Sequence, residues 1–483
     1  MMRRLPRRLT RLLAWSAGLV VVAAVAIGVA LLVTPMQTVT VAGQVIKVGT
    51  TSPRLSLSGP GEVDLFGQSL PTVVRFAGPV RPRLALTQIT IDSELANFAQ
   101  GSSPHSATHL LGSRLDDGWT RYFSWEAGIA GLTALVLTGA VAGWRRLPAS
   151  PTVRLLVAGL IVTQLINLGS IMLAARGAQK ALGQVRSLNE LVGSDPAPPA
   201  VNADGPLLPG VQAVVIGDST AAGAGLPLVA DASHIDRACG RSSDSYAEDL
   251  ARADNWHVMN LACNSATISH GLLGPQSKDG LGVPAQLGTT LRAQDASVVI
   301  VSVGADDLKW SAIVAYCAAA PRCNDRASTA YFQQKLAAFS KDYFQLLSEL
   351  ANLHGRPRVI INLYYDPFGN NLRCIAGRGL TAAKVTILGS RIATLNKVLS
   401  TGAAEFGYAS VQPSFAGHQL CSPQPYVQGA GDLAPFHPTE PGQLAIALAD
   451  QVALSGPAGT AGDGATGTPG ATGTPGTPGA TGP

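Results

Sequence analysis

Three long apolar stretches near the start of the chain are typical of membrane-spanning helices. Residues 12–33 contain no charged side chain, and about 20 apolar residues are enough to cross a bilayer. The other two stretches are residues 127–144 and 155–175. We expect an uncleaved anchor followed by two further spans, with a buried helical hairpin as the alternative for the second and third stretches.

Arginines set the expected orientation of these spans. They occur in "MMRRLPRRLTR", before the first stretch, and in "RRLPASPTVR", between the second and third. Basic residues next to membrane ends favour the cytoplasmic side. The two long remaining pieces, residues 35–120 and 176–483, are then expected outside the membrane, which predicts a multi-pass membrane protein with its larger domain extracytoplasmic.

Short alternating patterns follow the first apolar stretch. "TVTVAGQVIKV" and "RLALTQITID" alternate apolar and polar residues, with Gly and Pro between the runs. Alternation with a period of two is typical of strands that are half buried. We therefore expect a small β-rich extracytoplasmic domain within residues 35–120.

The pattern changes from about residue 211 to residue 454. The apolar runs "VQAVVI", "HVMNL", "ASVVIVSV" and "RVIINLYY" predict buried strands, and the longer segments between them have helical periodicity. Strands that alternate with helices indicate a parallel, doubly wound sheet, here a three-layer α/β/α flavodoxin-like fold. Ligands of such sheets bind beyond the carboxyl ends of the strands. Residues that follow each predicted strand are therefore the candidates for chemistry.

Composition and cysteine placement agree with an exported domain. The 483 residues are 46% hydrophobic and 13% charged, with a net charge of +5 and no basic, aromatic-rich stripe, so nucleic-acid binding is not expected. All six cysteines follow the third apolar stretch and none has the spacing of a metal site. An even set in one exported piece predicts three disulfides, although six cysteines allow fifteen pairings.

Glycine recurs at every third position from residue 464, in "GATGTPGATGTPGTPGATGP". This period resembles collagen, but a disordered spacer is favoured for so few triplets. The organisation that we expect is a cytoplasmic tail and first span (1–34), the β-rich domain (35–120), the second and third spans (121–176), a linker (177–210), the α/β domain (211–454) and the tail (455–483).

Four motifs occur in order along the α/β domain. They are "AVVIGDSTAAG", "NLACNSAT", "SVGADDL" and "FHPTEPGQLAIALA". Together they resemble the SGNH (GDSL-type) hydrolase family, and "CGRSSDSYAEDLA" and "LLGPQ" are similar to its secreted actinobacterial members. The resemblance covers about half of the chain and implies a serine esterase that needs no metal or organic cofactor.

The resemblance implies a role for four residues. Ser219 matches the nucleophile and His437 the general base, which activates the weakly nucleophilic hydroxyl. The backbone N–H of Ser219 would form part of the oxyanion hole, with Ser265 and Asp306 at the positions of the other two donors. The family has glycine and asparagine there. An ionised aspartate cannot donate a hydrogen bond, so either neighbouring Asp307 and low polarity keep Asp306 protonated, or the hole works with two backbone donors.

The residue that orients the histidine also departs from the family pattern. The family usually has an aspartate three residues before it, where this chain has Ala434. Asp432 lies five residues before His437 and is a candidate if the loop bulges. Some members use a Ser-His dyad with a backbone carbonyl in place of the aspartate, and we favour that arrangement here.

Each of these residues has a simpler interpretation as well. Ser219 could be the N-terminal cap of the next helix, because serine is a preferred cap. His437 could be an exposed turn residue, and Asp306 could belong to a carboxylate pair at a helix start. The order of the four motifs favours the catalytic interpretation for Ser219 and His437.

We therefore expect a membrane-anchored, extracytoplasmic serine esterase that acts on acyl esters, with envelope glycans or lipids as candidate substrates. The alternatives are an O-acyltransferase with the same residues and a non-catalytic envelope-binding module with a degenerate site. Because Cys239 and Cys263 flank the first two motifs, we expect them to pair. The other expected pairs are Cys317–Cys323 and Cys374–Cys421. Acyl chain, acceptor, the role of residues 35–120 and the oligomeric state do not follow from the sequence.

Overall fold

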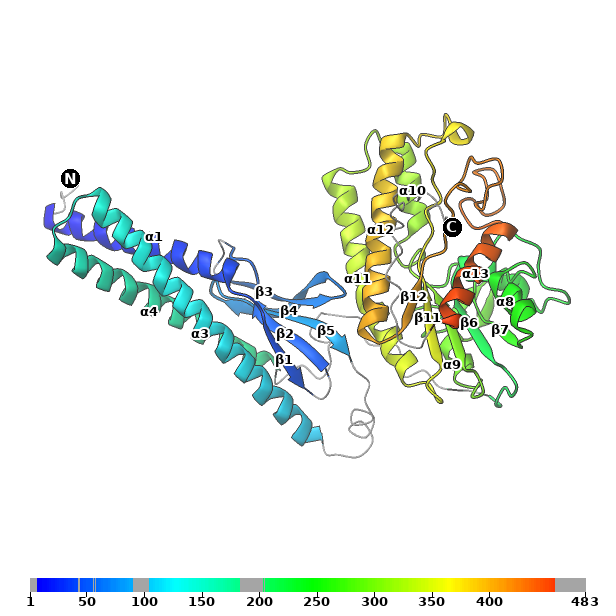
Figure 1. Cartoon of the computed structure of the whole chain (residues 1–483), viewed down its shortest axis with the longest axis horizontal. Helices are drawn as coiled ribbons and strands as arrows, with labels where there is room; N and C mark the ends of the chain where they lie inside the picture. The colour runs from blue at the N-terminus through cyan, green and yellow to red at the C-terminus, as the bar shows by residue number, and fades with distance from the viewer. Residues whose placement is uncertain are drawn as a thin grey trace, which may run out of the picture.

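A computed structural model of the chain describes residues 7–41, 44–54, 56, 58–89, 104–182, 203 and 205–456. The glycine-repeat tail that the sequence predicts lies outside the described residues, as does most of the predicted linker. The described parts form a helical bundle, a small β-sheet and an α/β domain, which follow one another from left to right in Figure 1.

The bundle consists of α1 (Arg7–Val33), α3 (Pro104–Trp144) and α4 (Ala149–Leu182). All three helices contain a segment long and apolar enough to cross a membrane, namely Leu13–Val33, Asp116–Trp144 and Ala149–Arg176. The prediction of three apolar helices is therefore confirmed.

Helix α3 begins earlier than the sequence analysis expects. Residues 104–120, which the sequence pattern places in the β-rich domain, belong to this helix. Leu111, Leu115 and Trp119 recur at intervals of four residues, while Ser113 and Asp117, which a strand would place on the same face, are polar. This pattern fits a helix and not a half-buried strand. The β-rich part therefore ends earlier among the described residues, at Ile89.

The small sheet has the strands β1 (Gln37–Val41), β2 (Gln44–Thr50), β3 (Ser58–Leu65), β4 (Gln68–Ala77) and β5 (Pro82–Ile89). Their order is β1-β2-β5-β3-β4, with β3 and β5 parallel and the other neighbours antiparallel. In β3 the side chains alternate between exposed or half-buried and buried positions, which gives the sheet one packed face. The sheet lies between the helical bundle and the α/β domain (Figure 1).

The α/β domain contains the parallel strands β6 (Ala213–Gly217), β7 (Val258–Asn260), β10 (Val298–Ser302), β11 (Arg358–Asn362) and β12 (Ala409–Val411). Their order is β12-β11-β10-β6-β7, the flavodoxin-like order that the sequence predicts. Every residue of β6 and β10 is buried, because helices cover both faces. A separate ribbon is formed by β8 (Gln276–Lys278) and β9 (Leu281–Val283).

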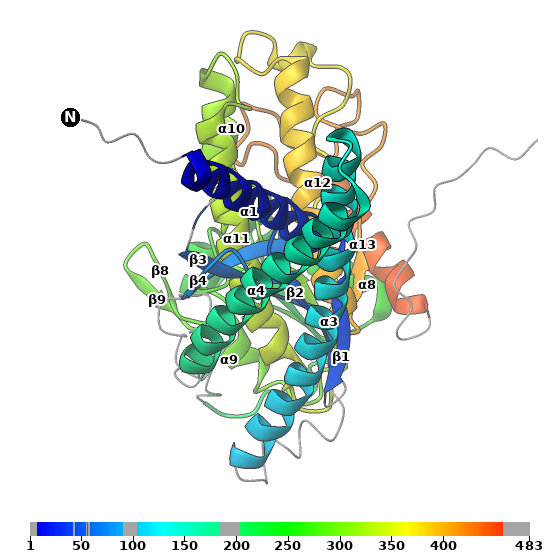
Figure 2. The ribbon, with the colours of Figure 1, turned by 90° about the vertical axis from the view of Figure 1, so that its left-hand side faces the viewer.

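Helices flank this sheet on both faces (Figures 1 and 2). The long helices α11 (Arg326–Ala351) and α12 (Ala382–Glu405) lie on the face towards the bundle, while α8 (Tyr246–Asp254) and α13 (Glu440–Ser455) pack together on the other. The remaining helices are α6 (Ser219–Ala222), α7 (His234–Cys239), α9 (Gln286–Thr290), α10 (Trp310–Ala319) and the short η1 (Arg373–Ile375).

The six cysteines are joined in three disulfides, Cys239–Cys263, Cys317–Cys323 and Cys374–Cys421. These are the pairs that the sequence analysis expects. The first connects the end of α7 to the loop after β7, so it fixes two of the segments that follow the strands. The third connects η1 to the loop before the predicted base.

Candidate active site

The turn after β6 holds the predicted nucleophile in a tightly packed position. Gly217 ends the strand, and a Cβ there would clash with the carbonyl oxygen of Ser302 in β10, so only glycine fits. Asp218 is the N-terminal cap of α6, accepting a hydrogen bond from the N–H of Thr220 at 2.9 Å. Ser219 is therefore the first residue of the helix and not its cap, and its hydroxyl is left for another partner.

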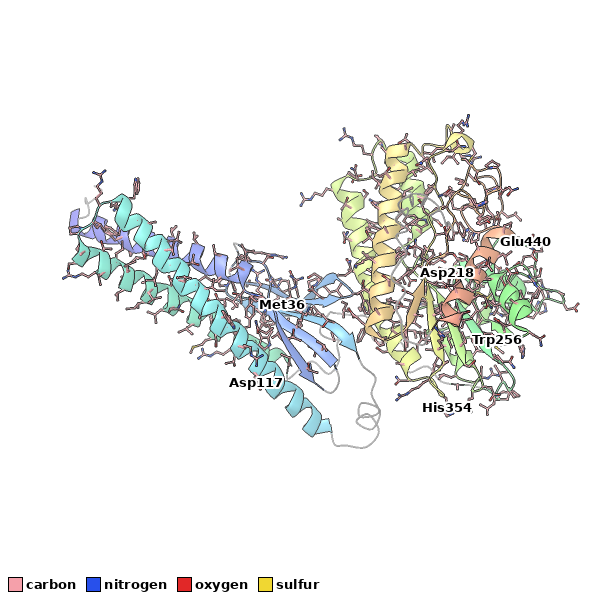
Figure 3. All side chains as sticks on the ribbon, in the orientation of Figure 1. Met36, Asp117, Asp218, Trp256, His354 and Glu440 are labelled. Carbon is pink, nitrogen blue, oxygen red and sulfur yellow. A yellow bond between two sulfur atoms is a disulfide. The ribbon has the colours of Figure 1, made fainter. Side chains whose placement is uncertain are left out.

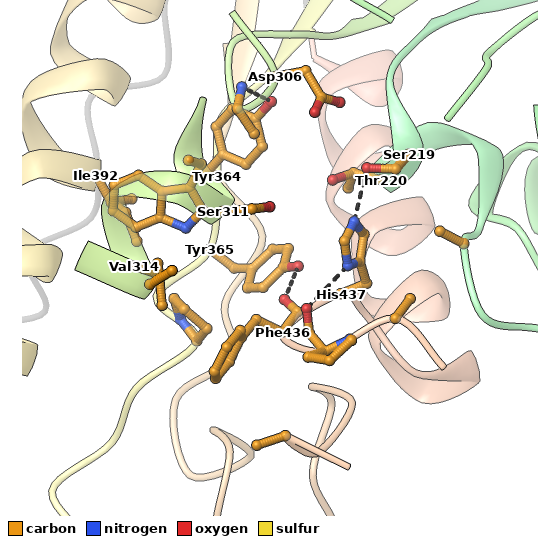
Figure 4. Close-up of a pocket in the computed structure, with 18 of the residues that line it drawn as sticks. Ser219, Thr220, Asp306, Ser311, Val314, Tyr364, Tyr365, Ile392, Phe436 and His437 are labelled. Carbon is orange, nitrogen blue, oxygen red and sulfur yellow. Dashed lines mark hydrogen bonds between the residues drawn. The ribbon is translucent and has the colours of Figure 1, made fainter. Parts of the chain in front are cut away.

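That partner is the predicted base. The Ser219 hydroxyl and Nε2 of His437 are 2.7 Å apart, and the two side chains face each other across the cleft in Figure 4. His437 lies in the loop before α13, a segment 218 residues away along the chain. A backbone carbonyl orients the ring, because Nδ1 is 3.2 Å from the oxygen of Pro435. This bond fixes the tautomer in which Nε2 is free to accept the serine proton.

In the described contacts, Asp432 bonds to its own loop and not to the imidazole of His437. Its carboxylate accepts a hydrogen bond from the N–H of Gly429 at 2.6 Å and so closes a local turn. The carbonyl of Pro435 takes the position at Nδ1 that the sequence analysis also considered for Asp432. Among the described residues, the geometry corresponds to the Ser-His dyad rather than to a triad.

The two remaining oxyanion-hole candidates border the same cavity as Ser219. Ser265 has a left-handed backbone with a φ of 65°. This conformation favours glycine, which explains why a glycine suits the position and shows that this chain tolerates a serine there. Asp306 is half-buried, and its Oδ2 atom is buried without a hydrogen-bond partner among the described residues.

Tyr364 connects the first and third motifs. Its hydroxyl donates to Asp218 at 2.7 Å and accepts from the N–H of Ala305 at 2.8 Å. The loop that carries Asp306 is therefore tied to the residue before the nucleophile. Tyr364 follows β11, where residues that take part in chemistry are expected in a parallel sheet, but the sequence alone indicates no role for it.

Burial and charge shift the pKa values of the acidic groups upward. Burial, with a smaller contribution from Asp306, raises the pKa of Asp218 to about 8. Burial also raises the pKa of Asp306, and the positive charges of His437, Lys309 and Lys278 only partly oppose it. A raised pKa keeps a carboxyl protonated, and thus able to donate a hydrogen bond, to higher pH.

The imidazole shifts in the opposite direction. Burial lowers the pKa of His437, although the carbonyl of Pro435 and the charge of Asp306 act against this. A lowered pKa keeps the ring neutral to more acidic pH, and a neutral ring is what a general base requires.

Asp307 holds the second motif in place beneath the cleft. Its Oδ1 accepts a hydrogen bond from the N–H of Ile268 at 2.9 Å, and burial raises its pKa to about 7. Ser269 donates to Asp342 of α11 at 2.8 Å. The second and third motifs are thus joined to each other and to the helix layer.

Gln428 ties the segment that follows Ser219 to the loop that carries His437. Its side-chain amide donates to the carbonyl of Ala224 at 2.7 Å and to that of Pro438 at 2.9 Å. Its oxygen accepts from the N–H of Ala434 at 3.3 Å. The residue is only 5% exposed, so all three bonds are shielded from water. The sequence carried no signal for this role, because a lone glutamine in a loop has no recognisable spacing.

Gln428→Met, which keeps the length of the side chain but removes its hydrogen bonds, is expected to lower kcat by about tenfold, since a small displacement of a catalytic group is costly. KM should change less than kcat, because the cavity walls are untouched. Steady-state kinetics and a melting curve measure both effects. A lower melting temperature with an unchanged kcat would show that Gln428 supports the fold without positioning His437.

A cavity of about 650 Å³ opens over the Ser219–His437 pair. One wall is apolar and is built by α10 and α12, as Figure 4 shows for Val314 and Ile392. The other apolar lining residues include Trp310, Ala315, Leu380, Leu395 and Phe436.

The acidic residues lie in different parts of the molecule. Asp218 lies within the α/β domain, whereas Asp117 is on the helical bundle (Figure 3). Within the described residues, no group of three or more His, Cys, Asp or Glu side chains could hold a metal ion.

Comparison with known proteins identifies the class of this domain. Residues 215–445 match the GDSL-like lipase/acylhydrolase family. The domain therefore belongs to that family and is an enzyme that hydrolyses ester bonds. This assignment favours the catalytic interpretation over the non-catalytic binding module.

Among the relatives, Lipase 1 of Streptomyces coelicolor is 28% identical over 244 residues, which are 48% of this chain and 81% of that protein. Two similar solved structures are phospholipase A1 from Streptomyces albidoflavus NA297 and an extracellular lipase from Streptomyces rimosus. The first is 21% identical with a TM-score of 0.41 and covers 51% of this chain and 100% of its own. The second is 21% identical with a TM-score of 0.38 and covers 49% and 98%.

Proposed function

We propose that the protein is a membrane-anchored, extracytoplasmic serine esterase that cleaves esters with an apolar, lipid-like acyl chain. The observation that carries the proposal is the 2.7 Å contact between Ser219 Oγ and His437 Nε2 at the base of a cavity with an apolar wall. Both residues come from the motifs that match the family.

In the proposed reaction, His437 Nε2 takes the proton of Ser219 while the serine oxygen attacks the ester carbonyl. The N–H groups of Ser219 and Ser265 and the protonated carboxyl of Asp306 donate hydrogen bonds to the oxyanion. The ester alkoxide then leaves with the proton from His437. Water, activated by the same imidazole, hydrolyses the acyl-enzyme and restores the serine.

The location is supported by two independent features. Three helices are long and apolar enough to span a membrane. In the chain, one of them precedes the small sheet and two follow it. The three disulfides all lie in the α/β domain, and disulfides persist in oxidising compartments outside the cytoplasm. Helices anchored in the membrane would hold the cleft close to the lipids and lipid-linked glycans of the envelope.

The lining of the cavity favours an acyl chain of intermediate length over an acetyl group. Trp310, Val314, Ala315 and Ile392 border it, and each methylene removed from water contributes about 0.8 kcal/mol. Because that binding energy can act in the transition state, longer esters should be hydrolysed with a higher kcat/KM.

The test is a series of p-nitrophenyl esters from acetate to octanoate, measured with the wild type and with Ala315→Trp. The exposed Ala315 borders the cavity, so the indole should fill it and lower kcat/KM for octanoate by about tenfold, a typical cost of lost pocket contacts. The rate with acetate should change little. The control is Ala312→Trp, an exposed position on α10 outside the cavity lining. Equal losses for acetate and octanoate would contradict an acyl site at this wall.

A further inference from the structure

The turn between β3 and β4 contains a phenylalanine, a residue that the backbone geometry of this turn does not favour. Phe66 and Gly67 connect the two strands with φ angles of 52° and 77°. Two positive φ values in a two-residue loop are the geometry in which Asn and Gly are preferred. A phenylalanine with positive φ is strained, and such strain persists only where the surroundings require it.

The surroundings of Phe66 are supplied by the α/β domain. The ring is 1% exposed and packs edge-on against Tyr343, with ring centroids 5.5 Å apart, and against Phe344 at 6.3 Å. Both partners belong to α11. Val63 and Leu65 in the same hairpin are fully buried in the core that includes the α/β domain. The tip of the hairpin is thus inserted into the helix layer of the other domain.

The receiving site on the α/β domain is itself firmly supported. Tyr343 stacks on Phe339 with ring centroids 5.4 Å apart, and its hydroxyl donates to the carbonyl of Leu399 in α12 at 3.0 Å. Phe339 in turn lies against Gly304, where a Cβ would be 3.4 Å from the ring. Gly304 precedes the loop of Asp306, so the docked ring and the catalytic loop contact the same helix.

The opposite side of the sheet is attached to the membrane helices. Val39, Ile46 and Val48 pack with Trp119 of α3, and the hydroxyls of Thr50 and Tyr122 are 2.6 Å apart. In Figure 1 the sheet lies between the bundle and the helices α11 and α12. Met36, labelled in Figure 3, marks the junction at which α1 passes into β1.

We propose that the sheet of residues 37–89 is a docking module that binds the α/β domain of its own chain through Phe66 and holds the catalytic cleft in a fixed orientation to the membrane helices. This gives the β-rich part a function beyond the proposed esterase reaction. Phe66 supplies the aromatic centre of the contact and Val63 and Leu65 flank it, while the attached strands and helices supply the rigidity.

The test uses the full chain in lipid nanodiscs with two spin labels, at Arg75→Cys in β4 and Gln334→Cys in α11. Both positions are exposed, and the native cysteines are all paired. The docked chain should give one narrow distance distribution. Phe66→Gly removes the ring but suits the turn, so it should fold and broaden the distribution. Phe66→Met, a flexible apolar side chain of similar volume, and the exposed control Val73→Asp should leave it narrow.

Three outcomes would overturn the proposal. These are a broad distribution in the wild type, a narrow one in Phe66→Gly, and a distance signal that arises only between two singly labelled chains, which would mean that the module binds a second copy. Turnover of p-nitrophenyl acetate is measured in the same samples and should agree within about twofold, because the variant leaves the Ser219–His437 pair and the cavity lining unchanged and keeps Tyr343 stacked on Phe339. Absence of turnover in the wild type would instead contradict the proposed esterase function and leave the docking result intact.

Discussion

Ser219→Ala is expected to lower kcat for p-nitrophenyl acetate by about 10⁴-fold or more, which is typical for loss of a serine nucleophile. The reason is that the Ser219 hydroxyl is the one hydrogen-bonded to Nε2 of His437, so its removal leaves the imidazole without a nucleophile to activate. Steady-state turnover by the purified full chain measures the effect. The melting temperature should change little, because the residue replaced is small and half-buried.

The matched control is Ser311→Ala. Ser311 borders the same cavity in Figure 4 but comes from α10, and the described contacts place His437 against Ser219. Its removal should leave kcat within about twofold of the wild type, as for most replacements that break no specific interaction. Equal rates for Ser219→Ala and the wild type would contradict the proposed mechanism. A large loss in Ser311→Ala would mean that the proposal names the wrong serine as the nucleophile.

His437→Ala should reduce kcat to a similar extent, and the double variant Ser219→Ala/His437→Ala should be no slower than either single one. Residues that act as one unit lose their function together, so their effects do not add. Additive losses would mean that the two side chains act in separate steps.

The sequence predicted those parts of the site that depend on chain order and strand pattern. The apolar run "VQAVVI" contains most of strand β6, Ala213–Gly217. The four ordered motifs point to Ser219 and His437, which the fold brings within 2.7 Å of each other despite their separation of 218 residues. Parallel strands bring their carboxyl ends to one edge, so the topology itself joins motifs that are distant in the chain.

Other parts depend on tertiary contacts for which a sequence has no local signal. The alanine at position 434 favours a backbone carbonyl as the group that orients His437, but which carbonyl does so depends on the path of the 432–437 loop, and the structure places that of Pro435 there. Phe66 reads as an ordinary strand-end aromatic until its positive φ and its contact with Tyr343 are known. The bridge through Gln428 likewise follows only from the folded chain.

Asp306→Asn is expected to change the shape of the pH profile. In the proposed mechanism a protonated Asp306 donates to the oxyanion, and burial raises the pKa of this carboxyl. The donor is therefore present below the raised pKa and is lost as the pH rises through it. On the acid side, activity is lost as the pH falls through the lowered pKa of His437. The wild type should give a bell-shaped profile of kcat against pH.

An asparagine amide donates at every pH, so Asp306→Asn should abolish the alkaline limb and keep the acid one. Since one oxyanion donor is worth about 10²–10³ in kcat, the variant should exceed the wild type by tenfold or more at about pH 9, where an ordinary carboxyl is fully ionised. The groups that face Asp306 are Asp218, Asp307, Tyr364, His437, Lys278 and Lys309. All remain in the variant, but the pKa values of Asp218 and Asp307 should be lower there, because the charge of Asp306 helps to raise both.

The control for this profile is Asp279→Asn, which removes an exposed carboxylate in the turn between β8 and β9 and should leave both limbs unchanged. A uniform loss of activity in Asp306→Asn across the pH range would mean that the carboxylate has a role that an amide cannot replace. An unchanged profile would mean that the oxyanion hole works with its two backbone donors alone. Either result concerns Asp306 alone, the position that departs most from the family pattern. Neither contradicts the role proposed for the Ser219–His437 pair, because the Ser219→Ala prediction depends on that pair and on no property of Asp306.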